Sequence, residues 1–515
     1  MSETLLGPSL AAAQAPEPDK TVTQAAVIDI GSNSVRLVIY WRDGRASWPI
    51  FNEKTLAGLG RGVSETGRLN EDGVRSALAT LRRFRQIIDA REVQQVTAFA
   101  TAAVRYAEDG EAFRKMVREE CGFSIKVLSG TDEAQLTALG VIAGGAEERF
   151  LVGDLGGSSL ELTDVADQKP GPGVSLALGP LALMMDETFD EKAARKAIDA
   201  EFDRISDLLE GAPPVFYAVG GAWRNLARID MMLRDYPLNV LHHYEMPRAE
   251  ALKMTDFAIS QSPASLSEIP GASSRRAPTL PYAAYLLKAL IERAGLETVF
   301  VSAYGVREGA LFNRLPRMVR KLEPLLASTV ALARRLSGTP YFGAELADWV
   351  APVFSAQASA FSPERDAVLL AAAASLADIG AAMHPDHRAA LVADQVLYAP
   401  FAGLDHSERC FLAAALHHRY AGKTSLAPDS TIARLLTQEQ LDAALKLGLA
   451  LRLGAVLSAR TKNLLARTTL TLKDGTLRLE LSQSARELAA DTSEKRLGQL
   501  ADALGVKNEI VIGDR

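Results

Sequence analysis

Residues 28–37, IDIGSNSVRL, return later in the chain as residues 153–162, GDLGGSSLEL. Four residue types recur at equal spacing, which pairs Asp29 with Asp154, Gly31 with Gly156, Ser34 with Ser159 and Leu37 with Leu162. One paired position changes sign, because Arg36 of the first copy is matched by Glu161 in the second. In each copy a polar, Gly-containing turn separates two apolar runs, and this pattern predicts a β-hairpin with a polar tip. The repeat therefore predicts two related halves.

Helical and extended patterns alternate after each copy of the hairpin. In the first half we expect a helix over residues 70–90, a strand over 93–100 and a helix over 110–121. The second half has strands at PVFYAVGGAW and TVFVSAYGVREG, each of which leads into glycines where a helix begins. Mixed strands and helices that restart at a repeated hairpin indicate two α/β domains of like architecture.

The remainder of the chain changes character at about residue 322. Up to about residue 458 it is rich in Ala and Leu with helical periodicity. Residues 468–482, TTLTLKDGTLRLELS, alternate apolar and polar side chains about an Asp-Gly turn, which is typical of a hairpin. We therefore predict a disordered tail without a signal peptide over residues 1–22, α/β domains over 23–147 and 148–321, a helical domain over 322–458, and a small α/β module over 459–515.

Composition limits the class of protein. Hydrophobic residues make up 48% of the 515 residues and charged residues 23%, which is typical of a globular protein. The formal net charge of −6 argues against a nucleic-acid binder, but it allows a local basic groove for a polyanionic substrate. The two cysteines lie far apart, as expected in a reducing compartment, so we predict a cytoplasmic protein. We expect no membrane span, because the most apolar run, from Ala367, is mostly alanine and is interrupted by Asp378.

The polar tips of the two hairpins are candidate phosphate sites. A Gly-rich turn lets backbone N–H groups approach an anion, and Ser or Asn side chains add further donors. The candidate phosphate-binding residues of the tips are Ser32, Asn33, Ser34, Gly156, Gly157, Ser158 and Ser159. The alternative is that the tips are ordinary tight turns, in which the same residue types are common. Two copies at matched spacing, each after a strand that ends in Asp, favour the phosphate hypothesis.

Four strings narrow the fold: DIGSNSVRL, SGTDEAQL, DLGGSSLEL and SAYGVREG. The duplicated hairpin resembles the actin/Hsp70/sugar-kinase superfold. The four strings together resemble the exopolyphosphatase/guanosine pentaphosphate phosphohydrolase family over about residues 25–315. The resemblance implies two ribonuclease-H-like α/β domains that close over phosphate and metal, followed by an all-α HD-like domain and a small C-terminal α/β module. It also implies a homodimer.

Within this resemblance the change of sign between the hairpins acquires a role. The guanidinium of Arg36 can meet phosphate oxygens. Asp154 and Glu161 can hold a hard divalent cation, Mg²⁺ or Mn²⁺, through oxygen ligands. Asp29 is a weaker, water-mediated candidate ligand. The alternative for Asp154 and Glu161 is a turn cap and a solvated carboxylate at a strand edge.

The string VLSGTDEAQL contains the candidate catalytic base. Ser129 and Asp132 fit a capping box, so Asp132 has a structural explanation. Glu133 has the ordinary alternative of a first-turn carboxylate that the helix dipole favours. The family resemblance implies instead that Glu133, the second acidic residue of the motif, is the general base that activates water for hydrolysis of a phosphoanhydride.

The same resemblance implies three further phosphate contacts. Thr101 and Arg105 in FATAAVR match a Thr-x-x-x-Arg element of the family. Arg307 in SAYGVREG follows a strand and a Gly turn, where it could complete the clamp. The alternative for each arginine is an ion pair with a neighbouring carboxylate such as Glu308.

Three features depart from the family pattern. Ser158 stands where a glycine is common, and we expect strain there if the position demands a positive φ. Trp223 in AVGGAWRNL stands where small residues are common, which predicts a reshaped substrate entrance. In LADIG, Ala377 stands where an HD metal site needs a histidine beside Asp378, so we expect no second hydrolase centre. The histidines of this region are assigned to packing and surface positions: His384, His387, His406, His417 and His418.

Four functions fit these features to different degrees. The first is an exopolyphosphatase that releases orthophosphate from the end of inorganic polyphosphate. The second is a guanosine pentaphosphate 5′-phosphatase, which the motifs do not separate from the first because both substrates present a terminal phosphoanhydride. An ATP-dependent, kinase-like transferase and a silent phosphate sensor are disfavoured by Glu133, which is placed to activate water. We therefore predict a metal-dependent hydrolase, an exopolyphosphatase first, with no nucleic-acid or membrane partner.

Overall fold

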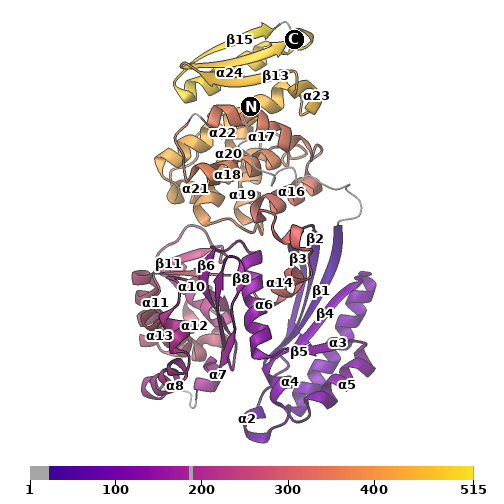
Figure 1. Ribbon diagram of the computed structural model, residues 1–515, viewed down its shortest axis with the longest axis vertical. Coiled ribbons are helices and arrows are strands. Elements are labelled where there is room, and N and C mark those ends of the chain that lie inside the picture. Colours follow the sequence, from indigo (N-terminus) through magenta and orange to yellow (C-terminus); the bar gives the residue numbers. More distant parts are fainter. Residues whose placement is uncertain (1–21, 185–188, 356, 514–515) are drawn as a thin grey trace. The chain divides into compact units, whose positions relative to one another are not determined.

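The computed structural model of the protein describes residues 22–184, 189–355 and 357–513. These residues form two compact units, residues 22–320 and residues 321–513 (Figure 1). The predicted tail over residues 1–22 lies outside the described residues except for its last position. In the part of the chain that the structure describes, no helix is both long and apolar enough to cross a lipid bilayer.

The first unit begins with a five-stranded sheet in the order β3-β2-β1-β4-β5. An antiparallel meander supplies three strands, β1 (Val22–Ile30), β2 (Val35–Asp43) and β3 (Ala46–Thr55). Parallel pairing adds β4 (Gln95–Ala100) and β5 (Ile125–Val127). Helices α3 (Glu71–Ala90) and α5 (Gly110–Cys121) pack on one face of this sheet. The predicted start of the first helix is confirmed, because the Asn70 side chain caps α3 by accepting a hydrogen bond from the Gly73 amide.

A second sheet repeats this strand order. Its strands follow one another as β8-β7-β6-β10-β12, with β11 as an additional antiparallel edge strand and β9 paired to β7. The bounds are β6 (Arg149–Leu155), β7 (Leu160–Ala166), β8 (Lys169–Pro170), β9 (Val174–Leu176), β10 (Val215–Gly220), β11 (Tyr244–Pro247) and β12 (Thr298–Val301). The shared order of three antiparallel strands and two parallel ones confirms the prediction of two α/β halves with like architecture.

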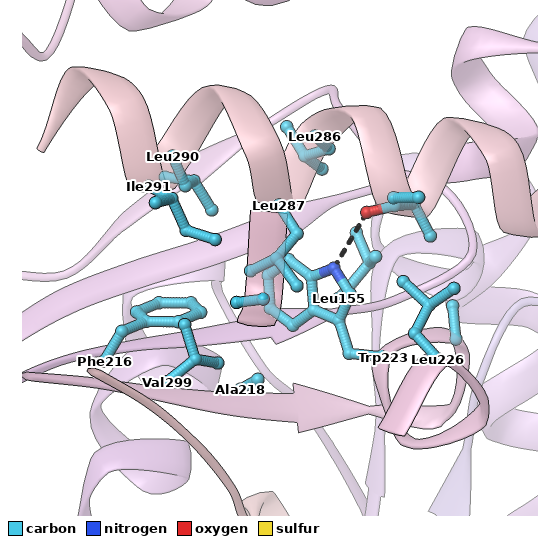
Figure 2. Packing of buried hydrophobic residues seen from close by; sticks show 14 of the residues in the cluster. Leu155, Phe216, Ala218, Trp223, Leu226, Leu286, Leu287, Leu290, Ile291 and Val299 are labelled. Carbon is cyan, nitrogen blue, oxygen red and sulfur yellow. Dashed lines mark hydrogen bonds between the residues drawn. The ribbon is translucent and has the colours of Figure 1, made fainter. Parts of the chain in front are cut away.

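Trp223 belongs to the core of the second half. It lies on α10 (Gly221–Leu233), is 1% exposed, and donates from its indole Nε1 to the carbonyl of Ala283 on α13 (Leu280–Arg293) at 3.0 Å. Figure 2 shows the ring between the sheet and α13, where its centroid lies 5.5 Å from that of Phe216. The predicted effect of Trp223 on a substrate entrance is therefore wrong, because the bulky ring fills space between a helix and the sheet.

Two helices lie between the two sheets and connect the halves (Figure 1). Helix α6 (Gly130–Ala143) follows the first sheet in the sequence, yet Ala138 and Val141 pack with the core of the second sheet. Helix α14 (Val306–Asn313) follows the second sheet, yet Ala310 and Leu311 pack on the first. Each half therefore supplies a helix to the core of the other.

The contact between α6 and α14 requires glycine on both sides. A Cβ added to Gly309 would lie 1.7 Å from the carbonyl oxygen of Leu136, and one added to Gly140 would lie 2.1 Å from that of Gly305. Backbone atoms cannot move aside as a flexible side chain can, so each helix presses its backbone against the other. The two helices thereby hold the ends of the sheets in a fixed relation.

The remaining described helices complete the first unit. They are α2 (Val63–Thr66), α4 (Ala102–Tyr106), α7 (Pro180–Leu183), α8 (Glu191–Asp203), α9 (Ser206–Glu210), α11 (Arg248–Ser260), α12 (Pro263–Glu268), the 3₁₀ helix η1 (Ser274–Thr279) and α15 (Arg317–Arg320).

The second unit is mostly helical and ends in a small sheet. Its helices are α16 (Pro324–Leu336), α17 (Phe342–Phe354), α18 (Pro363–Leu376), α19 (Arg388–Tyr398), α20 (His406–Ala421), α21 (Thr431–Leu435), α22 (Gln438–Leu457), α23 (Lys462–Leu465) and α24 (Asp491–Leu504), with the 3₁₀ helix η2 (Gln483–Leu488). The sheet has the order β13-β14-β15, with bounds β13 (Thr468–Lys473), β14 (Thr476–Ser482) and β15 (Lys507–Gly513). The predicted hairpin is confirmed, because Asp474 and Gly475 join β13 to β14 with φ of 49° and 70°.

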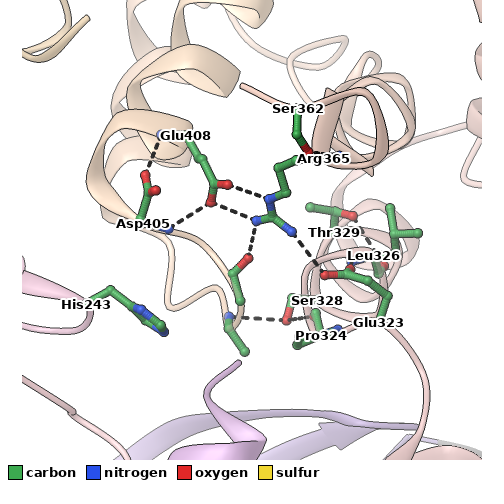
Figure 3. Close-up of polar contacts among 12 residues, drawn as sticks. His243, Glu323, Pro324, Leu326, Ser328, Thr329, Ser362, Arg365, Asp405 and Glu408 are labelled. Carbon is green, nitrogen blue, oxygen red and sulfur yellow. Dashed lines mark hydrogen bonds and ion pairs between the residues drawn. The ribbon is translucent and has the colours of Figure 1, made fainter. Parts of the chain in front are cut away.

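Polar groups tie the helices of this unit together. Arg365 on α18 forms a two-bond ion pair with Glu408 on α20, donates to the Gly403 carbonyl at 2.6 Å, and lies 3.4 Å from Glu323 (Figure 3). His406 and His418 are buried in α20, whereas His384 and His387 are exposed, as the assignment to packing and surface positions predicted. The all-helical character of this region is therefore observed, and its relation to HD domains stays a prediction.

Candidate active site

The two hairpin tips have the same backbone hydrogen bond. The Gly31 amide donates to the Ser34 carbonyl at 2.9 Å, and the Gly156 amide donates to the Ser159 carbonyl at 3.0 Å. The tips are therefore the same turn in three dimensions as well as in sequence. Ser158 is not among the described residues with positive φ, so the strain that we considered for this position does not arise.

A cavity of about 330 Å³ brings the predicted site residues together. Its lining includes the predicted residues Asp29, Ser32, Asn33, Ser34, Arg36, Thr101, Glu133, Asp154, Gly156, Gly157, Ser158, Ser159, Glu161 and Arg307. Arg105, which is not among the lining residues, contacts Glu133 from outside the cavity. Both hairpin tips, the start of α6 and the start of α14 therefore converge on one space.

Strand register explains the change of sign between the hairpins. Asp29 lies directly opposite Arg36 in the β1–β2 pair, and Asp154 lies directly opposite Glu161 in the β6–β7 pair. Opposite charges on facing positions stabilise a strand pair, whereas like charges destabilise it. The second hairpin thus places the carboxylates of Asp154 and Glu161 opposite each other, where they repel. A group outside the hairpin must offset this repulsion.

Each of these two carboxylates is fixed by a hydroxyl donor. Thr137 on α6 donates to Asp154 at 2.9 Å, and Ser175 on β9 donates to Glu161 at 2.8 Å. Burial, and then the neighbouring Asp154 carboxylate, raises the pKa of Glu161 to about 7. Burial likewise raises the pKa of Asp154. A cation between these oxygens would offset both effects, because it favours the ionised form of its ligands.

The donor set fits Mg²⁺ or Mn²⁺ held by two carboxylates. Among the described residues, no group of three or more His, Cys, Asp or Glu side chains is arranged to hold a metal ion. Asp29, the third predicted ligand, is instead paired with Arg307 at 3.3 Å. Mg²⁺ commonly binds through one or two carboxylates and completes its shell with water and substrate phosphates, so Asp154 and Glu161 suffice for such a site.

Glu133 lies in the first turn of α6 and faces the cavity. The predicted capping box is confirmed: Asp132 accepts from the Ser129 amide at 3.0 Å, and the Ser129 hydroxyl accepts from the Asp132 amide at 3.0 Å. This occupies Asp132 with the helix end and leaves Glu133, which is 8% exposed, beside the cavity. Burial, and then the charge of Glu161, raises the pKa of Glu133 to about 8. A carboxylate with a pKa near neutrality is suited to take a proton from water.

Arg105 orients Glu133. Its Nη1 lies 2.5 Å from Glu133 Oε1 and donates to the Leu128 carbonyl at 2.6 Å. Its Nη2 is buried without a hydrogen-bond partner among the described residues. The ion-pair alternative for this arginine is therefore observed, with Glu133 as its partner, and the direct phosphate contact stays a prediction.

Arg307 connects the two halves at the cavity. It lies on α14 and pairs with Asp29 on β1, while its neighbour Glu308 accepts from the Tyr40 hydroxyl at 2.5 Å and from the Gly305 amide at 2.9 Å. Burial lowers the pKa of Arg307, but Glu308 and Asp29 outweigh it and leave the pKa above its ordinary value. Its Nε is buried without a hydrogen-bond partner among the described residues, so this cation retains a free donor.

Four basic residues of the cavity were not predicted from the sequence. Besides Arg36 and Arg307, the lining includes Lys54, Arg224, Arg275 and Arg276. Arg224 donates from Nε to the Gly220 carbonyl at 3.1 Å, and Arg276 donates to the Gly221 carbonyl at 2.8 Å. Arg224 could have been found, because it follows the carboxyl end of a parallel strand, where ligands bind in open α/β sheets. Arg275 and Arg276 carry no local signal and reach the cavity only through the fold.

The backbone requires glycine at position 220, and Gly221 leaves space for Arg276. Gly220 has φ of 108°, and a Cβ there would lie 2.4 Å from the Leu155 carbonyl oxygen. A Cβ on Gly221 would lie 2.3 Å from the guanidinium of Arg276. Gly220 therefore allows the close approach of β10 to β6, and Gly221 makes room for a cation at the cavity wall.

Comparison with known proteins agrees with this arrangement. Residues 38–318 match the Ppx/GppA phosphatase family, and residues 325–511 match the family described as exopolyphosphatase, C-terminal. Exopolyphosphatase 1 of Mycobacterium tuberculosis is 29% identical over 309 residues, which cover 56% of this chain and 87% of that protein.

Solved structures agree with the sequence comparison. The Aquifex aeolicus member of the Ppx/GppA family is 25% identical with a TM-score of 0.51 and covers 56% of this chain and 96% of its own. An exopolyphosphatase from Cytophaga hutchinsonii shares the fold with a TM-score of 0.53 at 22% identity, over 57% of this chain and 98% of its own. The duplicated hairpins, the acidic helix start and these matches together show that the chain belongs to the Ppx/GppA phosphatase family, whose fold of two actin-like α/β halves it contains.

Proposed function

We propose that the protein is a metal-dependent exopolyphosphatase that hydrolyses the terminal phosphoanhydride of inorganic polyphosphate and releases orthophosphate. The observation that carries this proposal is the position of Glu133, a buried carboxylate with a raised pKa at the wall of a cavity built from two phosphate-type hairpin tips. The membership of a phosphatase family and the exopolyphosphatase relatives support the same activity.

The residues of the chain divide the work of the reaction. Glu133 accepts a proton from the water that attacks the terminal phosphorus, while Arg105 holds its carboxylate in place. Backbone amides and hydroxyls of the tips meet the terminal phosphate oxygens, and Arg36 and Arg307 offset their charge. The leaving group is the shortened polyphosphate, a weakly basic anion that departs without a strong general acid.

The metal would be held by Asp154 and Glu161. Bound Mg²⁺ or Mn²⁺ supplies neutralisation of the negative charge that builds up on the phosphate oxygens. The repulsion between these facing carboxylates and the raised pKa of each support this assignment. Asp29 serves better as the partner of Arg307 than as a direct ligand.

Guanosine pentaphosphate is the competing substrate, because it also presents a terminal phosphoanhydride. The lining favours polyphosphate: it offers the six basic side chains of Arg36, Lys54, Arg224, Arg275, Arg276 and Arg307, whereas Phe99 is the one aromatic ring among the lining residues. A chain of phosphates uses many cations, while a nucleotide would also need a surface for its base.

The test compares substrates and variants. Purified protein with Mg²⁺ is offered long-chain polyphosphate, guanosine pentaphosphate and ATP, and released phosphate is measured. We expect polyphosphate to give the highest kcat/KM. Faster hydrolysis of guanosine pentaphosphate would assign the alternative function, and hydrolysis of none of them would overturn the proposal.

Glu133→Gln is expected to lower turnover by roughly 10²–10⁴-fold, the usual contribution of a positioned acid or base. Polyphosphate binding, measured by filter retention, should survive. The matched control is Asp132→Asn, which removes the charge from the capping box of the same helix and should lower the unfolding free energy while turnover stays close to that of the wild type. A loss of less than tenfold in Glu133→Gln would show that the base is another group.

A further inference from the structure

Arg419, on α20 of the helical unit, is a largely buried cation. The residue is 8% exposed, and among the described residues its Nε is buried without a hydrogen-bond partner and no hydrogen bond or ion pair joins its guanidinium to a carboxylate. Its one specific contact is the ring of Tyr420, whose centroid lies 4.7 Å from Arg419 Cζ. Arginine stays protonated in proteins, so it cannot relieve its burial by losing the charge. A largely buried guanidinium without a carboxylate partner among the described residues is therefore suited to hold an anion from outside the chain.

A second arginine lies on the same ring. Arg388, at the start of α19, has its Cζ 5.9 Å from the Tyr420 centroid, and its Nε is buried without a hydrogen-bond partner in the described part of the chain. The ring itself is fixed, because its hydroxyl donates to the Ala377 carbonyl at 2.9 Å and accepts from the Gly380 amide at 3.0 Å. The guanidinium groups of Arg388 and Arg419 thus both lie near the ring of Tyr420, whose position is fixed by hydrogen bonds.

A third arginine is brought close by a strained turn. Ala459 and Arg460 follow α22 with φ of 50° and 63°, in the left-handed region that such residues rarely adopt. This turn lets Arg460 donate to Asp378 at 2.9 Å, and the hydroxyls of Ser337 and Thr339 donate to the other oxygen of that carboxylate. Asp378 is thus fully engaged elsewhere and forms no ion pair with Arg419.

The charges around Arg419 leave an excess of positive charge. Burial lowers the pKa of Arg419; Tyr420 and Asp378 act in the opposite direction, whereas Arg460 and Arg388 lower the pKa further. Strain at residues 459–460 and the buried Nε atoms of Arg388 and Arg419, which lack hydrogen-bond partners among the described residues, are unfavourable for the free protein. Features that lower the stability of the free protein are often found at ligand-binding sites. Here each of them involves an arginine.

We propose that Arg388, Arg419 and Arg460 form a binding site for a phosphate-class anion in the helical unit, which we call the Arg419 site. Phosphate matches the fork of a guanidinium with paired oxygens and accepts several charge-assisted hydrogen bonds at once. The anion is either free orthophosphate, which a phosphatase itself releases, or the phosphate group of a nucleotide. The residues of the Arg419 site do not overlap with those that line the catalytic cavity, so occupancy here is separate from substrate binding there.

The experiment measures binding of labelled orthophosphate to the full-length protein by equilibrium dialysis at constant ionic strength. All proteins carry Arg307→Gln, which weakens phosphate contacts in the catalytic cavity equally throughout. Into this background we introduce Arg419→Gln or Arg388→Gln. The matched control is Arg478→Gln, which removes an arginine of the same unit whose side chain is 49% exposed and paired with Glu509.

We expect Arg419→Gln and Arg388→Gln each to weaken phosphate binding by about tenfold or more, and Arg478→Gln to leave it unchanged. Circular dichroism and gel filtration check the fold. If the buried Arg419→Gln variant does not fold, the half-buried Arg388→Gln variant decides the outcome. Equal affinities in Arg388→Gln and Arg478→Gln, or no phosphate binding to the background protein at millimolar concentrations, would overturn the proposal.

A second arm distinguishes the two sources of the phosphate group. Unlabelled orthophosphate and a nucleoside diphosphate compete with the labelled ion for the same background protein. Tighter competition by the nucleoside diphosphate assigns a nucleotide to the Arg419 site, and equal or tighter competition by orthophosphate assigns the free ion. If either compound competes equally well in the Arg388→Gln variant, the proposal that Arg388 belongs to the binding site is contradicted.

Discussion

Arg105 holds in place the carboxylate of Glu133, which we assign as the base. The same contact makes Glu133 a weaker base. The hydrogen bond and the charge of Arg105 lower the pKa of Glu133, against the larger raising effects of burial and of Glu161. A base works in its deprotonated form, so kcat/KM should rise with pH as Glu133 loses its proton. Arg105 therefore sets both the position of Glu133 and the lower end of the working pH range.

Arg105→Met should lower turnover and move the acidic limb of the pH profile of kcat/KM to higher pH, because the pKa of Glu133 rises when the cation is lost. Arg105→Lys, which keeps the charge but not the planar fork, should move the limb less. The measurement is kcat/KM for polyphosphate against pH at saturating Mg²⁺. A lower rate with an unmoved limb would show that Arg105 contacts substrate and does not tune Glu133.

Asp154 and Glu161 test the metal assignment at the same scale. Asp154→Asn and Glu161→Gln should each raise the Mg²⁺ concentration for half-maximal activity by roughly tenfold or more. Mg²⁺ should also raise the unfolding temperature of the wild type, as any ligand of the native state does, and should no longer do so in the variants. In metal-free buffer both variants should be at least as stable as the wild type, since each removes one of two repelling charges.

The control for these carboxylates is Asp132→Asn, an acidic residue of the same region that is occupied by the helix cap. It should leave the Mg²⁺ titration unchanged. Identical titrations for Asp154→Asn, Glu161→Gln and the wild type would remove both residues from the metal site.

At the scale of elements, the contact between α6 and α14 positions the active site. Helix α6 carries Glu133 and α14 carries Arg307, and the two backbones meet at Gly140 and Gly309. A one-carbon addition at either glycine would push the helices apart and separate Glu133, the proposed base, from Arg307, the proposed phosphate contact. Packing far from the reacting atoms is thereby coupled to the geometry of the cavity.

Gly140→Ala and Gly309→Ala should each lower the unfolding free energy of the first unit by roughly 1–3 kcal/mol, the usual effect of overpacking. They should also lower kcat for polyphosphate. Gly498→Ala is the matched control, because this helical glycine of α24 has no atom within 4 Å of an added Cβ. It should stabilise its helix by about 0.5–1 kcal/mol. Urea unfolding and kcat measure both effects, and a stable, fully active Gly309→Ala would show that the helices can separate without consequence.

At the scale of the whole molecule, a protein of net charge −6 gathers six basic side chains, against four carboxylates, at the cavity of the first unit. This local field should attract a polyanion although the molecule as a whole is acidic. The predicted homodimer and cytoplasmic location concern the same scale and stay predictions, which sedimentation and cell fractionation would test.

Raised ionic strength should therefore lower kcat/KM for polyphosphate, because salt screens exposed charges over about 8–10 Å. Arg276→Gln should lower kcat/KM, since Arg276 lines the cavity. It should also make kcat/KM less dependent on salt. Arg204→Gln is the control, an arginine with a 69% exposed side chain paired to Glu201 on α8. If kcat/KM depends on salt equally in Arg276→Gln and Arg204→Gln, the attraction of polyphosphate comes from the protein surface as a whole and not from the cavity.

The sequence by itself determined the features that repeat or that follow local rules. The two halves were predicted from the duplicated hairpin, because an Asp-Gly-Ser pattern between apolar runs specifies a turn wherever it stands. The cap at Ser129 and Asp132 and the hairpin turn at Asp474 and Gly475 were predicted for the same reason, since each depends on neighbours three or fewer residues away. The role proposed for Glu133 came from the family resemblance, because local chemistry leaves it open. The phosphate hypothesis for the hairpin tips came from the residues themselves, since two such tips recur at matched spacing, each after a strand that ends in Asp.

Only the tertiary structure decided which distant residues meet. Arg275 and Arg276 reach the cavity through the packing of η1 and α13, which no spacing in the sequence encodes. Trp223 lies beside the Gly-Gly turn in sequence, yet its side chain points into the core, because a helix turns successive residues by about 100°. Asp29 became the partner of Arg307, 278 residues away, because α14 packs on the first sheet. Local rules fix the turns and caps, whereas long-range burial selects the partners of each charge.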